Sequence, residues 1–388
     1  MKEIYLDNAA TTRMKPEVLE AMLPYFTDYY GNASGVYSLG ARSKMVLDQA
    51  RGKIASTIGA YEEEIFFTSG GSESDNWALK AVCEAYQHKG KHIITTQMEH
   101  HAILHTASYL ETRGFEVTYL PVDHEGFVSL KELEEAMRED TILVSVMYVN
   151  NEIGSILPIK EIGELCHKHG ILFHTDAVQA YGHIPIHVKE NQIDLMSVSA
   201  HKFHGPKGVG FLYIKNGLEL SSFIHGGSQE RGRRAGTENI PGIVGMAKAA
   251  ELAHRDMEVN EEKISKLRDY MINRVMKENT QVFLNGPKGE NIKLRASNNV
   301  HLSFAHVAGE SFLIRLDMEG VAASAGSACT SGSTDPSHVL LAIGMDRELA
   351  YSSLRFTLSE ETTREEIDRT CDLIRQIVSQ LRELSPIF

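Results

Sequence analysis

The sequence has few cysteines and only one tryptophan. Its 388 residues include 4 Cys and 1 Trp. The cysteines, Cys83, Cys166, Cys329 and Cys371, lack the close paired spacing of a zinc knuckle or of a small disulfide scaffold. This scatter favours a reducing compartment, and we expect a cytoplasmic protein.

Runs of positive charge and long hydrophobic runs are also missing. The chain has 39 basic and 52 acidic residues, a net charge of -13, and no Lys/Arg run long enough to follow a phosphate backbone. The longest apolar run, around residues 141–149, is far short of the roughly 20 residues that cross a bilayer. The amino terminus has charge where a signal peptide needs an apolar core. We therefore expect no nucleic-acid ligand, no membrane span and no export.

Short apolar strand-like runs alternate with helical patterns through the first two thirds of the chain. The runs are residues 64–68, 92–96, 115–120, 142–148, 171–176, 194–199 and 210–214. Helical patterns at 130–138 and 159–169 lie between some of them. This order predicts an α/β fold with a mainly parallel sheet, in which ligands gather at the carboxyl ends of the strands.

After about Gly236 the pattern changes to a long helix, then to strand-like and loop segments, then to a final helix. Thr363 and Glu366 have the spacing of a capping box at the start of that last helix. We therefore expect a second, smaller domain, packed against the first because no linker rich in Pro or Ser separates them.

Two predicted strands end in residues that suit an aldehyde cofactor. Lys202 follows the strand at 194–199, where a partly desolvated amine can form an imine. Asp176 ends the strand at 171–176, and a carboxylate there can keep the ring nitrogen of pyridoxal phosphate protonated. A solvated lysine and a helix N-cap are the structural alternatives.

Two other strand ends carry further candidates. Small residues around Ser72 open a helix whose N-terminus can bind a phosphate. His100 can stack on a flat ring or carry protons. His101 and His105 lie four apart and are a candidate metal pair, but the spacing places no further ligands, so we expect no metal.

Cys329 lies among small residues, in Ser-Ala-Gly-Ser-Ala-Cys-Thr-Ser-Gly-Ser at 324–333. A reactive thiol must be accessible and a structural one is buried. We interpret Cys329 as reactive, and Cys83, Cys166 and Cys371 as core residues.

Eight motifs, in order along nearly the whole chain, resemble those of the NifS/IscS-type cysteine desulfurases, in the class V aminotransferase family of pyridoxal phosphate proteins. They are Tyr-Leu-Asp-Asn-Ala-Ala-Thr-Thr at 5–12, Ser-Gly-Gly-Ser-Glu-Ser at 69–74, Glu-His-His-Ala at 99–102, Val-Asn-Asn-Glu-Ile-Gly at 149–154, His-Thr-Asp-Ala-Val-Gln at 174–179, Ser-Ala-His-Lys at 199–202, Arg-Ala-Gly-Thr at 234–237 and Gly-Ser-Ala-Cys-Thr-Ser at 326–331.

The resemblance implies pyridoxal phosphate fold type I, with a mainly parallel seven-stranded sheet and helices on both faces. It implies a large domain of residues 12–258 and a smaller α+β domain of residues 1–11 and 259–388 that carries a mobile Cys329 loop. It also implies a homodimer, because Thr237 would reach into the neighbouring subunit.

The resemblance also implies a role for each matching position. Pyridoxal 5'-phosphate would be covalently bound to Lys202, with Asp176 on the ring nitrogen, His100 on the ring face, Gln179 and Asn151 on the ring-oxygen side, and Gly71, Ser72, Ser199, His201 and Thr237 at the phosphate. Arg355 and Asn151 would bind the substrate, and Arg355 would pair with its carboxylate, for which a two-pronged guanidinium is suited. Cys329, Lys202 and His100 would be catalytic.

The implied reaction converts L-cysteine to L-alanine and leaves a persulfide on Cys329 for a protein acceptor, either an iron-sulfur scaffold or a thiolation enzyme. Residues 31–35 read Gly-Asn-Ala-Ser-Gly, where the family commonly has a proline after the asparagine. The alternatives are a selenocysteine lyase or serine-type aminotransferase of the same fold, and a non-catalytic sulfur carrier.

Overall fold

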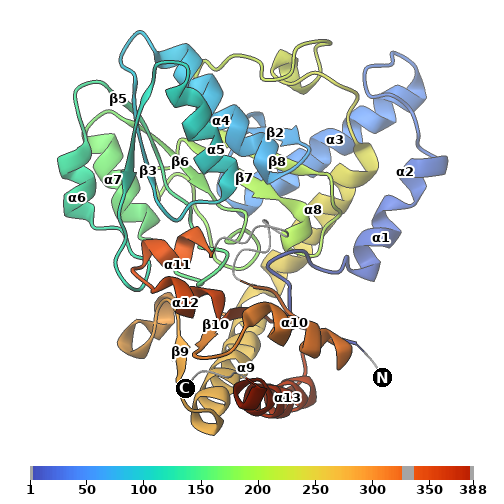
Figure 1. Ribbon diagram of the computed structural model, residues 1–388. Coiled ribbons are helices and arrows are strands. Elements are labelled where there is room, and N and C mark those ends of the chain that lie inside the picture. Colours follow the sequence, from blue (N-terminus) through green and yellow to red (C-terminus); the bar gives the residue numbers. More distant parts are fainter. Residues whose placement is uncertain (1–2, 326–335, 385–388) are drawn as a thin grey trace.

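A computed structural model describes residues 3–325 and 336–384. In Figure 1 the upper body contains a large sheet and the lower body contains two smaller ones. The large sheet has the order β2-β8-β7-β6-β5-β3-β4. Its strands are β2 (Ile65–Thr68), β3 (His92–Thr96), β4 (Glu116–Leu120), β5 (Thr141–Ser145), β6 (Leu172–Asp176), β7 (Leu195–Ser199) and β8 (Gly210–Ile214).

Only β8 in this sheet runs antiparallel to its neighbours, β2 and β7, and the other pairs are parallel. The predicted mainly parallel, seven-stranded sheet is therefore confirmed. The strand predicted at 142–148 was too long at its end: β5 stops at Ser145, and the Met147 amide donates to the Glu99 carboxylate instead of to a strand (3.0 Å).

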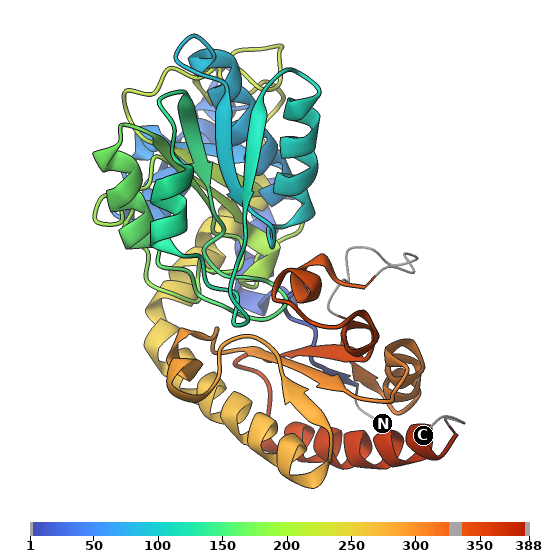
Figure 2. The same cartoon turned by 60° about the vertical axis from the view of Figure 1, so that its left-hand side comes forward.

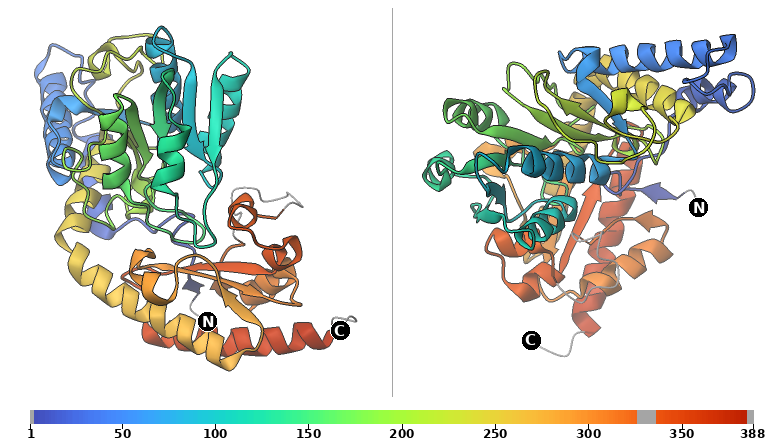
Figure 3. Two further views of the ribbon diagram at one scale, coloured as in Figure 1. Left: turned by 90° about the vertical axis from the view of Figure 1, so that its left-hand side faces the viewer. Right: turned by 90° about the horizontal axis from the view of Figure 1, so that it is seen from above.

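Helices cover both faces of the large sheet. They are α1 (Pro16–Met22), α2 (Pro24–Thr27), α3 (Ser38–Thr57), α4 (Gly71–Tyr86), α5 (His101–Glu111), α6 (Leu130–Ala136), α7 (Ile159–Lys168) and α8 (Ile240–Arg255), with the 3-10 turns η1 (Glu62–Glu64), η2 (Ala200–Lys202) and η3 (Glu230–Gly232). Strand side chains alternate between faces, so Ile65 and Phe67 join one hydrophobic cluster and Phe66 joins another. The first cluster contains residues of α3, α7 and α8 and the second contains residues of α4 and α5, which lie on opposite sides of the sheet in Figure 3.

The lower body combines two small sheets with helices, which confirms the predicted α+β character of the second part of the chain. Its elements are β1 (Ile4–Tyr5), α9 (Met257–Glu278), β9 (Val282–Leu284), η4 (Gly289–Leu294), β10 (Asn299–Phe304), α10 (Gly309–Met318), β11 (Val321–Ala322), α11 (His338–Ala342), α12 (Arg347–Tyr351), β12 (Ser353–Thr357) and α13 (Arg364–Leu384). Strands β12, β10 and β9 form an antiparallel sheet, and β1 pairs with β11 in parallel. Figure 2 shows α9 and α13 side by side beneath these sheets.

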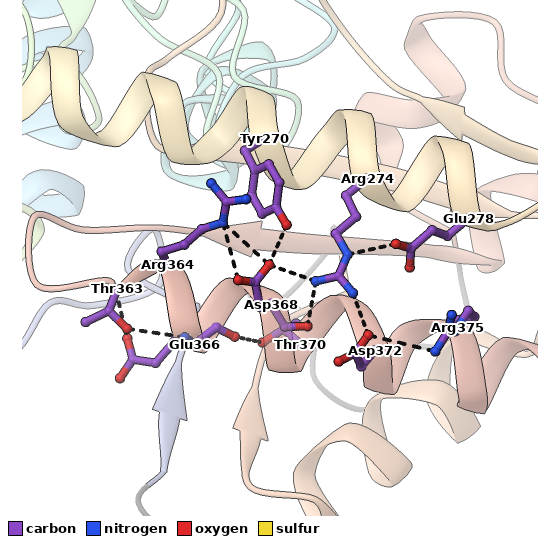
Figure 4. A network of polar contacts seen from close by, with 10 residues as sticks. All are labelled: Tyr270, Arg274, Glu278, Thr363, Arg364, Glu366, Asp368, Thr370, Asp372 and Arg375. Carbon is purple, nitrogen blue, oxygen red and sulfur yellow. Dashed lines mark hydrogen bonds and ion pairs between the residues drawn. The ribbon is translucent and has the colours of Figure 1, made fainter.

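The start of α13 is capped as the sequence predicted. The Glu366 amide donates to Thr363 Oγ1 (3.2 Å), and the Thr363 amide donates to the Glu366 carboxylate (3.0 Å). One turn further on, Arg274 of α9 pairs with Asp368 of α13 at 2.8 Å, within a wider network of polar contacts (Figure 4). These contacts fix α13 against α9 at the solvent side of the lower body.

The two bodies have separate cores. Leu6 from the amino terminus joins Leu302, Phe356 and Ile374 in the cluster of the lower body. Leu340 of α11 belongs instead to the cluster of the large sheet. We retain the division into residues 12–258 and residues 1–11 plus 259–388 as a proposal. The cluster of the lower body supports it, whereas α11 and α12 pack against the core of the large sheet.

The three cysteines interpreted as core residues, Cys83, Cys166 and Cys371, are all buried and have free thiols, which confirms that interpretation. Within the described ranges, no helix combines the length and the apolar composition that a membrane span requires.

Candidate active site

A cavity of about 370 Å³ lies at the carboxyl ends of the central strands. Ten of the predicted site residues line it: Gly71, Ser72, His100, Asn151, Asp176, Gln179, Ser199, His201, Lys202 and Arg355. They come from segments spread over most of the chain, and the parallel strands bring them to one edge of the sheet.

Lys202 reaches this cavity because the chain turns sharply after β7. Lys202 ends the 3-10 turn η2, which follows directly on Ser199. Its Nζ donates to the carbonyl oxygens of Ala9 (2.6 Å) and Ala10 (2.9 Å). The Gln179 side-chain amide also donates to the Ala9 carbonyl (2.9 Å). The amino-terminal segment therefore lies across the cavity and holds the lysine amine at its wall.

Asp176 and His100 face the same cavity from neighbouring strand ends. The Asp176 carboxylate accepts the Val178 amide (2.9 Å). Burial raises its pKa, while the Val178 hydrogen bond and the charge of Lys202 act in the opposite direction. His100 Nδ1 accepts the Ala102 amide (3.1 Å), which places the proton of the neutral ring on Nε2. Burial, and then the charge of Lys202, lower the His100 pKa to about 4, so the imidazole is neutral near pH 7.

The amino terminus of α4 forms one wall of the cavity at Gly71 and Ser72. The described structure shows no side-chain cap at this helix end, and Gly70 has a φ of 149°. A Cβ on Gly71 would lie 2.6 Å from Val178 Cγ2, so only glycine lets this turn approach the loop after β6 so closely. The backbone N–H groups of the first turn can therefore bind an anion.

Arg355 is buried at the opposite wall, on β12. Its Nη1 donates to the Asn151 carbonyl (2.9 Å), and its Nη2 pairs with Asp7 (3.0 Å). Arg355 Nε has no hydrogen-bond partner among the described residues. A guanidinium fixed in this way can still offer a donor to a carboxylate.

Two of the predicted site residues are not among the described residues that line this cavity. Thr237 is exposed and does not line it. Cys329 lies in the segment 326–335, outside the described residues. The rings of His101 and His105 are 5.0 Å apart, but the described residues add no third ligand to that pair.

Sequence reasoning assigned no role to two acidic residues beside the cavity. Asp7 lies in the quoted motif at 5–12, but its pairing with Arg355 joins residues 348 positions apart, and no local pattern signals it. Asp75 lines the cavity. Its position four residues after Gly71, on the same face of a helix, could have predicted this from the sequence. Asp75, His100 and Asp176 each offer one ligand atom within 4.8 Å of the others, a spacing that can hold a metal ion.

A lysine, a carboxylate and an imidazole at the carboxyl edge of this sheet define a pyridoxal phosphate enzyme of fold type I. The chain matches the family Aminotransferase class-V over residues 4–370. A Cysteine desulfurase IscS of Clostridium botulinum is 55% identical over 387 residues, which cover 100% of this chain and 97% of the relative.

Two solved structures are also similar to this chain. A NifS-like protein has a TM-score of 0.91 and 39% identity, covering 97% of this chain and 100% of its own. A structure described as SspA in complex with cysteine has a TM-score of 0.80 and 35% identity, covering 93% of this chain and 100% of its own. This chain belongs to the class V aminotransferase family, among its NifS/IscS-like cysteine desulfurases.

The family implies pyridoxal phosphate, and the cavity residues fit that group. The α4 amino terminus without a side-chain cap suits a phosphate, and the close approach at Gly71 leaves its backbone accessible. Asp176 offers a carboxylate for a protonated ring nitrogen, and neutral His100 offers a flat ring to stack on it. Lys202 supplies the amine that such enzymes use for an aldehyde.

Proposed function

We propose that this protein is a pyridoxal phosphate-dependent cysteine desulfurase, which converts L-cysteine to L-alanine and transfers the sulfur to an acceptor as a persulfide on Cys329. The observation that carries the proposal is the meeting of Lys202, Asp176, His100 and Arg355 around one cavity. The names of the relatives support the same activity.

The cofactor would be held at both of its ends. We propose a covalent bond from its aldehyde carbon to Lys202 and an ion pair between its ring nitrogen and Asp176. His100 would stack on the ring. The remaining contacts would be Gln179 and Asn151 on the ring-oxygen side, and Gly71, Ser72, Ser199 and His201 at the phosphate.

When bound, the cofactor supplies an aldehyde for the substrate amine and a protonated ring that draws electrons from the substrate carbon. Arg355 binds the substrate carboxylate and so fixes which bonds of the substrate face Lys202. The Lys202 amine, held 2.6 Å from the Ala9 carbonyl, takes and returns protons at that carbon. His100, neutral near pH 7 with its proton on Nε2, can donate that proton in a hydrogen bond within the site.

Cys329 takes the sulfur. Its sulfur bonds to the substrate sulfur while the carbon–sulfur bond breaks, and the electron pair of that bond stays on the carbon, which gains a proton. The products are alanine and a persulfide, and no external oxidant is needed. The described residues on both sides of the segment 326–335 support this role: Ser324 exchanges two backbone hydrogen bonds with Arg355 (2.7 and 3.1 Å), and His338 lines the cavity.

A homodimer and a protein acceptor complete the proposal. Thr237 is exposed, so it is available to the phosphate site of a neighbouring subunit. Exposed apolar side chains on α1, α2 and the loop that follows, among them Leu23, Phe26 and Val36, suit a subunit interface. The cytoplasmic location predicted from the cysteine content stays part of the proposal.

Alanine release from L-cysteine in the wild type and in Cys329→Ser tests this function. A serine hydroxyl is scarcely ionised near neutral pH and is a poor nucleophile toward sulfur, so the variant should bind cofactor and cysteine but release no alanine. Mass spectrometry of the wild type should find an added sulfur on Cys329.

The buried cysteines supply the matched controls. Cys83→Ala, Cys166→Ala and Cys371→Ala should lose some stability through lost packing and keep turnover. Wild-type release by Cys329→Ser, or a persulfide on another cysteine, would contradict the role of Cys329. Faster alanine formation from selenocysteine would favour the selenocysteine lyase, and a purified protein without cofactor would favour the sulfur carrier.

A further inference from the structure

Asp75 is a buried acid at the floor of the cavity to which the proposed reaction gives no role. It lies on α4, with a side chain only 1% exposed, and it lines the cavity. Its Oδ1 is buried and has no hydrogen-bond partner among the described residues. A buried carboxyl oxygen without a partner is costly unless it carries a proton or meets a ligand.

A chain of hydrogen bonds from three strands orients the Asp75 carboxyl. The Ser197 hydroxyl hydrogen-bonds Asp75 and lies 3.0 Å from His174 Nε2. His174 Nδ1 lies 2.8 Å from the Ser145 hydroxyl. If Ser197 donates to Asp75, then His174 Nε2 donates to Ser197 and Ser145 donates to His174 Nδ1. Every donor in this chain then has an acceptor. Asp75 Oδ1 lies 3.7 Å from His174 Nε2, and a ligand atom of the same carboxyl lies within 4.8 Å of Asp176 and His100.

Two buried carboxyls therefore lie close together at the cavity. Ligand atoms of Asp75, Asp176 and His100 all lie within 4.8 Å of one another. Asp176 has stabilising partners for a negative charge, because it accepts the Val178 amide (2.9 Å) and is close enough to Lys202 to feel its charge. Asp75 has no such cation: its nearest basic group is His174, with Nε2 at 3.7 Å.

The buried groups around Asp75 do not supply a counter-charge. Burial lowers the His174 pKa to about 3, so its ring is neutral. Glu99, at the start of the α5 loop, has a pKa raised to about 8 by burial, so it too is uncharged near pH 7. Burial, and then the charge of Asp176, raise the pKa of Asp75 well above its ordinary range. Like charges this close do not both ionise, and Asp176, which has the Val178 amide and the charge of Lys202 beside it, keeps the charge.

We propose that Asp75 is a positioning residue for Asp176: it stays protonated, directs its carboxyl hydrogen toward the Asp176 carboxylate, and is itself oriented by the chain Ser145, His174 and Ser197. Asp176 then presents a single, fixed negative charge to the cofactor ring. The proposal rests on the proposed function only in assigning Asp176 to the ring nitrogen.

Infrared difference spectra of the full-length, cofactor-loaded protein test the proton directly. At neutral pH, the carbonyl stretch of a protonated carboxyl should be present in the wild type and lost in Asp75→Asn. Glu99→Gln serves to assign the second such band that Glu99 is expected to give. If Asp75→Asn removes no protonated-carboxyl band, Asp75 is ionised and the proposal is wrong.

Two substitutions of similar volume test the positioning. In Asp75→Asn the amide keeps one donor toward Asp176 and one acceptor for Ser197, so the dissociation constant of pyridoxal phosphate should stay within about twofold of the wild type. In Asp75→Leu the donor toward Asp176 and the acceptor for Ser197 are both lost, and the dissociation constant of pyridoxal phosphate should rise about tenfold or more. Equal affinities in the two variants would show that the site needs only the volume of residue 75, which would overturn the proposal.

The same spectra separate this proposal from the proposed function. Repeated on the wild type without cofactor, they report the proton on Asp75 whether or not the protein desulfurates cysteine. A protein that releases no alanine but shows the Asp75 band would refute only the function, and an active protein without the band would refute only the role of Asp75.

Discussion

Asp7 and Arg355 form an ion pair of 3.0 Å across 348 residues of sequence, between the amino-terminal segment and β12. Arg355 is 2% exposed, and its second terminal nitrogen donates to the Asn151 carbonyl of the large body. One guanidinium thus connects the two bodies at the wall of the cavity. Because each terminal nitrogen carries a second N–H, the same group can hold the bodies together and bind a substrate carboxylate.

Replacing Asp7 should destabilise the protein. Asp7→Asn leaves the buried Arg355 cation without its counter-charge, and we expect the free energy of unfolding to fall by about 2 kcal/mol. Denaturant unfolding of the cofactor-free protein measures this change in the free energy of unfolding. Glu3→Gln, an exposed change close by in the chain, is the matched control and should have no effect. Equal stabilities for Asp7→Asn and the wild type would mean that the pair contributes nothing.

Lys202 should be the residue that binds the cofactor covalently. Borohydride reduction of the loaded wild type should attach a pyridoxyl group to Lys202, because the other lysine of that loop, Lys207, does not line the cavity. Lys202→Ala should fold and give no labelled peptide, whereas Lys207→Ala should be labelled like the wild type. A label on Lys207 in the wild type would show that the wrong lysine was chosen.

Asp176→Asn should keep the fold and lose most of the activity. The change removes the negative charge that keeps the cofactor ring protonated, while the shape of the side chain hardly changes, so alanine release should fall by about two orders of magnitude or more. Asp140→Asn, an exposed aspartate at the opposite edge of the sheet, controls for the loss of one negative charge. Near-normal turnover in Asp176→Asn would assign the ring nitrogen to another group.

The exposed apolar surface of α2 should lie in a subunit interface. Phe26 is 59% exposed, and Phe26→Asp should convert a dimer into a monomer in sedimentation experiments. Cofactor affinity should fall with it, since Thr237 could no longer reach the phosphate of a neighbour. Met318→Asp, at a more exposed apolar site on α10, should stay dimeric. A monomeric wild type would contradict both the interface and the role of Thr237.

Glu360 should make stability depend on pH in the acid range. Burial raises its pKa, but the hydrogen bond and charge of His204 and the contact with Lys15 outweigh burial, so the pKa lies well below the ordinary 4.5. A depressed pKa stabilises the folded state above the unfolded value and loses this contribution as pH falls. As the pH falls below about 4.5, the free energy of unfolding of the wild type should therefore decrease by on the order of 2 kcal/mol more than that of Glu360→Gln. If the free energies of unfolding of the two proteins decrease equally as the pH is lowered, this prediction is wrong.

Much of this fold could be predicted from local patterns. All seven predicted runs became strands of one sheet, because buried parallel strands need short, nearly continuous apolar stretches. The cap of α13 could also be predicted, since the side chains of Thr363 and Glu366 each accept a hydrogen bond from the other's backbone amide within one turn. The end of β5 was misplaced because Val146 and Met147 are as apolar as the strand itself. The Val146 and Tyr148 amides still donate to carbonyls of β6, and only the Met147 amide donates to a side chain, that of Glu99.

The sequence by itself determined which residues stand at the ends of the strands, and hence that Lys202, Asp176 and His100 would meet at one edge of the sheet. Only the tertiary structure decided which groups surround them. Asp7 meets Arg355, and Asp75 lies beside Asp176 without a cation, because segments distant in the chain converge there and exclude water. The charge state of a buried carboxyl depends on those neighbours and on the lost hydration, and neither can be read from its position in the chain.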